Sequence, residues 1–99
     1  MKVLISARAR TDVEAVADFI AINNPARAET FAAGLVRACI AIGDRPRVYP
    51  VKENLHPELR IRYYKKHAIV YQFTERQVLI VRVVHAARDL SALLDDELD

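Results

Sequence analysis

The sequence has one cysteine, Cys39, and only two glycines in its 99 residues. A single cysteine cannot form a disulfide within the chain, which excludes a fold held together by disulfides, and we expect Cys39 to be a small buried residue on the apolar side of a helix. Gly34 and Gly43 alone cannot build a glycine-rich loop for a phosphate group. The three histidines are spaced 11 and 18 positions apart and form no cluster with the cysteine, so neither a metal site nor a cofactor is predicted.

Long apolar runs are also missing. The most apolar stretch, Val78 to Ala87, is interrupted by Arg82 and His85 and is far shorter than the roughly 20 residues that cross a bilayer as a helix. The apolar run after Lys2 ends at Ile5, which is too short for the core of a signal peptide. We therefore expect a soluble protein of the cytoplasm with no membrane partner.

What the chain does have is the composition of a globular protein with an uneven charge. Hydrophobic residues make up 53% and charged residues 28%, and the length predicts a single domain over residues 1–99. Residues 45–88 hold ten basic side chains against three acidic ones, a net charge of +7, whereas residues 89–99 hold five acidic side chains and no basic one. A positive region suits RNA, DNA or an acidic protein partner, or else is an ordinary solvated face.

Two amphipathic helices are predicted in the first half of the chain. Residues 2–6 read as a short strand ending at Ser6, a helix-capping residue, and apolar residues then recur at helical spacing as far as Ile20. Asn24, which precedes a proline, begins the second helix, and Gly43 is expected to end it as a glycine cap. Because the connection between the helices is very short, they are expected to pack as an antiparallel hairpin.

Strands are predicted in most of the second half. Residues 44–58 contain three prolines and read as an irregular connection with a short edge strand near Val48. Apolar patterns typical of strands follow in residues 59–64, 67–73 and 78–84, the last being a central strand. Leucines at helical spacing in residues 89–99 predict a short final helix or a helix-prone tail.

The fold class that follows is α+β, with an N-terminal strand, a helical hairpin and a mostly antiparallel sheet arranged in two layers. The hairpin covers one face of the sheet. No other predicted layer covers the opposite face, so we expect the arginine-bearing strand positions to lie there, where a ligand or a partner would bind.

Five short segments also carry a resemblance to a known family. In chain order they are Ala9, Asp12-Val13, Val16 and Phe19-Ile20; Asn23-Asn24-Pro25 with Ala28 and Phe31; Pro46 to Pro50; Leu59-Arg60, Tyr64 and Ile69-Val70-Tyr71; and Arg82-Val83-Val84-His85 with Arg88-Asp89. Together they span nearly the whole chain and resemble the RelE/ParE superfamily of toxins from type II toxin–antitoxin systems. The last segment is most similar to the ParE-like and plasmid-stabilisation branch.

The resemblance implies a function as well as a fold. ParE-like toxins inhibit DNA gyrase and are neutralised by a cognate antitoxin, similar to ParD, in a hetero-oligomer. RelE-like toxins instead cleave messenger RNA on the ribosome, and they often carry a tyrosine close to the C-terminus. No tyrosine follows Tyr71 in this chain, which favours the ParE-like interpretation. The alternatives are a RelE-like, metal-free endoribonuclease and an inactive binding module of the same fold.

Candidate site residues follow from the chemistry of each alternative. In a nuclease, Arg60, Arg62 and Arg82 would hold a phosphate and His85 would act as the acid or base. In a gyrase inhibitor, the same four residues together with Arg88 would bind the target. The helical hairpin and the sheet are expected to leave an apolar groove that an amphipathic segment of the partner fills, but the sequence does not indicate which residues bind the antitoxin.

Structural interpretations compete with each of these roles. Arg82 lies in an apolar strand and would pair with a carboxylate such as Glu53 or Asp89. The His85 ring would bond to a backbone group or to Asp89. Tyr63, Tyr64 and Tyr71 would either stack on bases or pack in the core.

Overall fold

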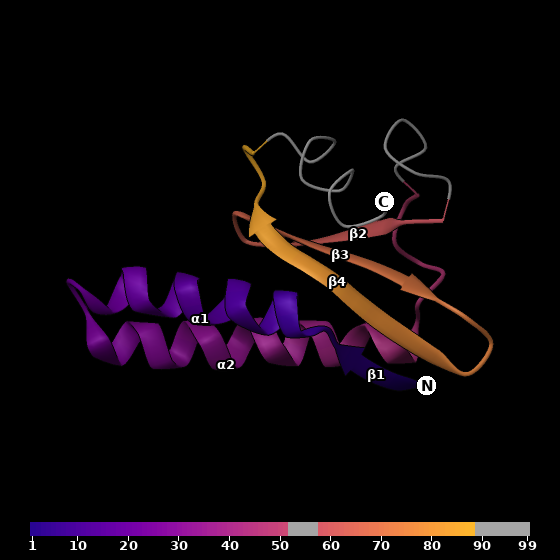
Figure 1. Ribbon diagram of the computed structural model, residues 1–99, viewed down its shortest axis with the longest axis horizontal. Coiled ribbons are helices and arrows are strands. Elements are labelled where there is room, and N and C mark those ends of the chain that lie inside the picture. Colours follow the sequence, from indigo (N-terminus) through magenta and orange to yellow (C-terminus); the bar gives the residue numbers. More distant parts are fainter. Residues whose placement is uncertain (52–57, 89–99) are drawn as a thin grey trace.

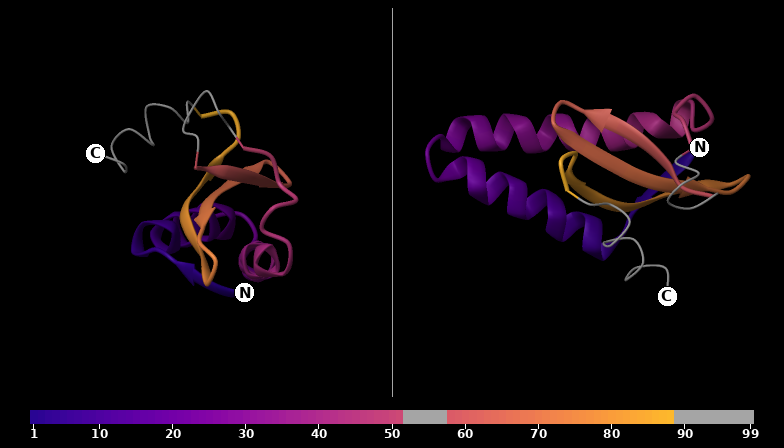
Figure 2. Two further views of the ribbon diagram at one scale, coloured as in Figure 1. Left: turned by 90° about the vertical axis from the view of Figure 1, so that its right-hand side faces the viewer. Right: turned by 90° about the horizontal axis from the view of Figure 1, so that it is seen from above.

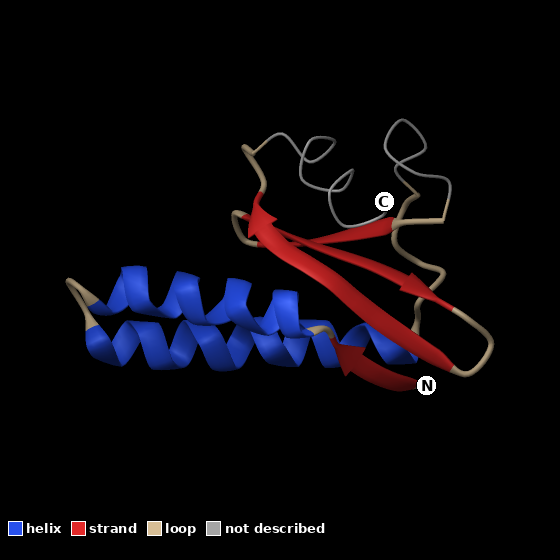
Figure 3. Cartoon of the chain, viewed as in Figure 1, coloured by secondary structure: helices blue, strands red, loops and turns tan. Residues whose placement is uncertain are grey.

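The computed structural model describes residues 1–51 and 58–88 of the chain (Figure 1). Their elements are, in order, β1 (Lys2–Ile5), α1 (Ala7–Ala21), α2 (Pro25–Ala41), the 3₁₀ turn η1 (Ile42–Asp44), β2 (Arg60–Tyr64), β3 (His67–Phe73) and β4 (Gln77–His85). The two helices lie side by side as one layer, and the sheet crosses over them as the other (Figures 2 and 3). This arrangement confirms the predicted α+β class. The predicted C-terminal helix in residues 89–99 lies outside the described residues.

Both helices begin where the sequence predicts, because each starts with a side-chain cap. The Ser6 hydroxyl accepts a hydrogen bond from the Ala9 backbone N–H at 3.0 Å, and the Asn24 side-chain oxygen accepts one from the Arg27 N–H at 3.1 Å. Each bond satisfies one of the donors that the first turn of a helix leaves unpaired. Pro25 stands in the first turn of α2, where its missing N–H costs nothing.

The prediction that Gly43 ends α2 as a left-handed glycine cap is wrong. Neither glycine of the chain has a positive φ, and Gly43 lies inside η1. A methyl group at Gly43 would collide with the backbone carbonyl oxygen of Met1 and would press on a methyl of Val3. The glycine is therefore explained by the close approach of the N-terminal strand rather than by backbone conformation.

Replacing Gly43 with alanine is expected to lower the free energy of unfolding by about 1–3 kcal/mol, because a backbone group must shift to admit the methyl group. Gly34→Ala is the matched control: its added methyl group meets the Tyr64 hydroxyl, the far end of a side chain, and alanine gains about 1 kcal/mol over glycine inside a helix. Urea denaturation of both variants measures the difference, and an equal loss at the two positions would contradict the packing explanation.

The sheet has four strands in the order β1-β4-β3-β2. β4 pairs with β1 in parallel and with β3 antiparallel, and β3 pairs antiparallel with β2. The predicted central position of the apolar strand is confirmed, since β4 has neighbours on both sides. A tight turn at Lys65 and Lys66, in which Lys65 has a φ of 54°, joins β2 to β3 as predicted.

The edge strand that the sequence predicts near Val48 is not formed there. Val48 lies in a bend, and the pairing with the sheet is a single antiparallel bridge further along, between Val51 and Arg60. The segment is held instead by the buried Tyr71 hydroxyl, which donates a hydrogen bond of 2.6 Å to the Pro46 carbonyl. Proline on both sides of Val48 limits ladder hydrogen bonds in this stretch, which explains the difference.

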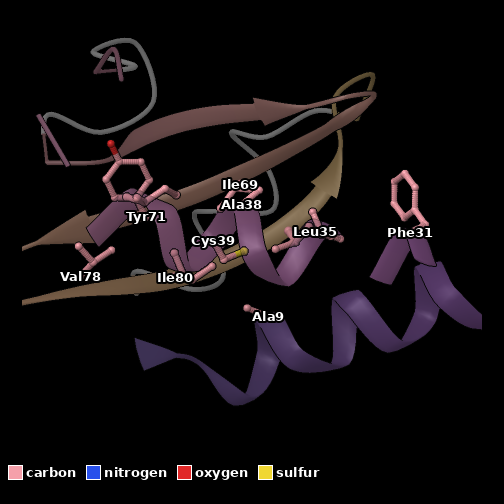
Figure 4. Packing of buried hydrophobic residues seen from close by; sticks show 11 residues of the cluster. Ala9, Phe31, Leu35, Ala38, Cys39, Ile69, Tyr71, Val78 and Ile80 are labelled. Carbon is pink, nitrogen blue, oxygen red and sulfur yellow. The ribbon is translucent and has the colours of Figure 1, made fainter. Parts of the chain in front are cut away.

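Buried apolar residues cover both faces of the sheet. The larger cluster fills the space between the helices and the sheet and includes Leu35, Cys39, Tyr71 and Ile80 (Figure 4). The second cluster lies on the other face, and its buried members are Leu59, Ile61, Ala68, Val70, Val81 and Val84. The face opposite the helices is therefore not the open, arginine-rich surface that the sequence analysis predicted.

Candidate functional site

Arg60 and Arg62 lie on the helix-facing side of β2, which corrects the predicted placement. The Arg62 guanidinium donates a hydrogen bond of 2.6 Å to the Ala38 carbonyl, in the last turn of α2. The Arg60 guanidinium donates to the carbonyls of Arg47 and Tyr49, at 3.2 and 2.6 Å. The last four carbonyls of a helix lack partners within the helix and attract a cation, so these arginines hold the sheet to α2 and to the following loop.

Arg82 lies on the other face of the sheet and forms an ion pair with Asp12 of α1. Its Nε and Nη2 donate to the two carboxylate oxygens at 2.8 and 3.0 Å, and only 4% of Arg82 is exposed. Asp12 also accepts the backbone N–H of Val83 at 2.9 Å. The structural interpretation of Arg82 is thus supported, but with a partner that the sequence did not single out; Glu53 and Asp89 lie outside the described residues.

The outer edge of β4 explains why Asp12 is placed there. β1 pairs only with the first half of β4, as far as Ile80, and α1 runs beside the second half. Ser6 donates from its hydroxyl to the Val81 carbonyl at 3.0 Å, and Asp12 accepts from the N–H of Val83. Side chains of α1 and its cap therefore bind backbone groups that a longer edge strand would otherwise pair.

His85 has a close neighbour that was not among the candidate site residues. His67 is its register partner across β3 and β4, and the two rings meet edge to face with centroids 5.6 Å apart. The His67 ring also contacts the Phe31 ring at 5.4 Å. The Nδ1 of His85 accepts the N–H of Ala87 at 3.1 Å, which agrees with the predicted bond to a backbone group.

Burial shifts the pKa of three described groups, on His67, Cys39 and Tyr71. It lowers the pKa of His67, and the adjacent His85 lowers it further. Burial raises the pKa of the Cys39 thiol to about 11 and that of the Tyr71 hydroxyl to about 12. Cys39 is therefore no nucleophile near neutral pH, and Tyr71 packs in the core rather than stacking on a base.

Of the remaining candidate residues, Arg88 and Tyr63 are exposed and Tyr64 is half-buried. Arg88 is exposed in the turn that follows β4, and Tyr63 is 48% exposed on the face of β2 away from the helices. Tyr64 packs edge to face on Phe31, with ring centroids 5.8 Å apart. The five predicted target-binding residues are thus divided: His85 and Arg88 are exposed, whereas Arg60, Arg62 and Arg82 are engaged within the fold.

A groove of about 530 Å³ lies between the helical hairpin and the end of the sheet that carries His67 and His85. Its floor is apolar, with Phe19 of α1 and Phe31 of α2, and lysines of the β2–β3 turn line its edge. The sequence predicted an apolar groove between the helical hairpin and the sheet but not the residues that line it, because these come from α1, α2, the turn before β3 with its first residue, and the end of β4. The available signal was the exposed phenylalanine on α1, which is 75% accessible.

Neither a cluster of metal-ligating side chains nor a membrane-spanning helix occurs in residues 1–51 and 58–88. Within these ranges no group of three or more potential ligand side chains is arranged to hold a metal ion. No described helix has the length and apolar character required to span a membrane.

Comparison with known proteins places the chain among toxins. The model of the family described as the ParE toxin of type II toxin-antitoxin system, parDE, matches residues 3–90. No curated protein sequence gives a significant match. Among solved structures, a chain of the chromosomal ParDE TA system from P. aeruginosa is similar with a TM-score of 0.71 and 15% sequence identity, over 86% of this chain and 95% of that one. At this identity the likeness shows a shared fold.

Proposed function

Since the chain belongs to the ParE toxin family and is the toxin component of a type II toxin–antitoxin system, we propose that it arrests growth by inhibiting DNA gyrase. A cognate antitoxin, resembling ParD, silences it in a hetero-oligomer. Gyrase acts on chromosomal DNA, so the toxin acts in the cytoplasm. It does so by binding, without a reaction of its own, and the exposed His85 and Arg88 contribute to the contact with the target.

The dispersal of the candidate nuclease residues is the observation that carries this proposal. Cleavage of RNA without a metal requires cations at the phosphate together with an acid and a base on either side of it. Arg60 and Arg62 bind carbonyl groups on one face of the sheet, and Arg82 binds Asp12 on the other. Because these three guanidinium groups are engaged within the fold on two faces of the sheet, their placement supports an inhibitor that binds its target over a nuclease.

An endoribonuclease remains the second candidate because of a different group of residues. His67 and His85 lie side by side, and Lys65 and Lys66 line the same groove, so two imidazoles and two cations are close together. The imidazole rings contact each other edge to face, however, which leaves no room for a phosphate between them. The apolar floor of the groove also suits a protein side chain better than a phosphate.

A double variant separates the two candidates. His67→Gln combined with His85→Gln retains hydrogen-bonding groups but removes every proton transfer near neutral pH. We expect the variant still to arrest growth when expressed, with a modest loss because His85 contributes to the contact with the target, and the antitoxin gene encoded beside the toxin gene to relieve the arrest in both cases. A nuclease that depends on these rings would instead lose roughly 100-fold or more in its cleavage rate.

Growth curves and the integrity of messenger RNA after induction are the measurements. Intact messenger RNA during the arrest supports the gyrase proposal. A folded double variant without any toxicity, or codon-specific cuts made by the unchanged chain and abolished in the variant, would refute it.

A further inference from the structure

A second pocket, of about 460 Å³, lies at the end of the sheet where β3 turns into β4, on the right in Figure 1. Its wall combines the Phe73 ring with the side chains of Arg60, Gln72 and Gln77. Glu58 is the one acidic side chain among the described residues that line it, and it is exposed. A pocket with a cation and two amides in its wall suits a charged ligand better than an apolar one.

Two arginines meet at the Phe73 ring. The Arg47 guanidinium lies 5.1 Å from the ring centre, and the Arg60 guanidinium lies 5.5 Å from it. The Arg60 guanidinium also donates a hydrogen bond to the Arg47 carbonyl, so the fold holds the two residues together. Neither forms an ion pair with any residue in 1–51 or 58–88. The ring offsets part of the repulsion between the two positive charges, and an anion beside them would offset the rest.

Both arginines have hydrogen-bond donors that the fold does not use. The two bonds from Arg60 to backbone carbonyls come from Nη1, and its Nε and Nη2 donate to no group in the described part of the chain. The exposed Arg47 guanidinium donates no hydrogen bond there either. A guanidinium presents its five N–H groups as a planar fork, which matches the oxygens of a phosphate group. The two side chains at Phe73 are therefore suited to bind a phosphate.

The surrounding charge favours a polyanion over a single small anion. Residues 45–88, which include both arginines, carry a net charge of +7. A positive field of this kind attracts the phosphate backbone of a nucleic acid, whatever its sequence. DNA is the substrate of the gyrase that we propose as the target, so a toxin bound to gyrase lies close to such a backbone.

We propose that the pocket at Arg47, Arg60 and Phe73 binds a phosphate group of DNA, so that the toxin contacts the DNA held by gyrase as well as the enzyme. The inference rests on the proposed function and extends it, because it names a second ligand and the residues that bind it. Arg47 and Arg60 supply charged donors, and Gln72 and Gln77 supply neutral ones. A contact of this kind positions the DNA without selecting its sequence.

Fluorescence anisotropy of a short labelled DNA duplex, titrated with the purified chain, tests the site. Arg47→Gln removes an exposed charge at the pocket, and Gln77→Glu introduces a carboxylate into its wall. Each is expected to weaken binding roughly fivefold or more, and Arg47→Gln to reduce the slope of log affinity against log salt concentration by about 0.9. The matched control, Arg10→Gln, makes the same change in net charge at an exposed position of α1 and is expected to change the affinity by less than about twofold.

Melting temperatures of the three variants establish that each is folded. Equal affinities for the pocket variants and the control would overturn the proposed site. Displacement of the duplex by ATP at an equal concentration of phosphate groups would also overturn it, because the pocket would then be a mononucleotide site, and so would tighter binding of an RNA hairpin. Failure of this proposal is distinguishable from failure of the proposed function, since a chain that blocks supercoiling without binding the duplex refutes only the contact with DNA.

Discussion

Replacing Arg82 with alanine is expected to lower the free energy of unfolding by about 3–5 kcal/mol, the usual cost of removing one partner from a buried ion pair. The Arg82 and Asp12 side chains are only 5% and 13% exposed. Loss of the guanidinium leaves the Asp12 carboxylate with the Val83 N–H but without the two charged donors that this structure shows on its oxygens. The buried negative charge then has too little compensation, and the contact between α1 and β4 weakens.

Three further variants test whether the loss of stability comes from the Arg82–Asp12 ion pair. Asp12→Ala is expected to be destabilising to a similar degree, because it leaves the Arg82 charge in a buried position. The double variant is expected to lose less than the sum of the two single changes, since the residues share one interaction. Arg88→Ala removes an exposed arginine close to the same strand end and should change stability by no more than about 0.5 kcal/mol. Denaturant unfolding gives all four values.

The opposite result has a specific meaning. If Arg82→Ala is as stable as the unchanged chain but is not toxic, Arg82 contributes to binding of the target and not to the stability of the fold. A structural role for Arg82, as the residue that fastens α1 to the sheet, would then be refuted.

Most of the fold was predicted from patterns among residues that are close together in the sequence. The cap at Ser6, the cap at Asn24 with its following proline, and the turn at Lys65 and Lys66 depend on neighbours in the sequence, and the structure confirms all three. The central position of β4 was also predicted, because a strand buried on both faces requires an almost continuous apolar run. These features need no knowledge of how distant segments meet.

The site was predicted less well because it depends on distant contacts. Arg82 and Asp12 are 70 positions apart, and no local pattern selects that carboxylate among the others. The face of Arg60 and Arg62 was misassigned because both faces of the sheet are buried, so alternation alone does not show which face meets the helices. His67 was not among the candidate site residues, although the register of the antiparallel pair places it directly opposite His85.

The groove illustrates the same limit. Phe31 belongs to the apolar stripe that predicted the second helix and is buried, whereas Phe19 lies outside the stripe that predicted the first helix and is exposed. Their common role appears only when the end of the sheet is placed beside the hairpin.

Inhibition of DNA supercoiling is the second large effect expected of this protein. A toxin that binds gyrase should stop the supercoiling of relaxed plasmid almost completely once it is in excess over the enzyme, because a bound inhibitor blocks every turnover of the complex it occupies. The His67→Gln/His85→Gln variant should still inhibit, since no proton transfer is involved, with a modest loss because His85 contributes to the contact with gyrase. Adding the antitoxin before gyrase should restore supercoiling.

The most direct measurement of the gyrase proposal is therefore supercoiling in the presence of the purified chain, run in parallel with ribosome-bound messenger RNA as an alternative substrate. The Arg82→Ala protein, used at a temperature at which it is unfolded, controls for nonspecific effects of a basic chain. We expect supercoiling to be blocked and the messenger RNA to stay intact. Unimpaired supercoiling together with codon-specific cleavage of the messenger RNA would contradict the proposal.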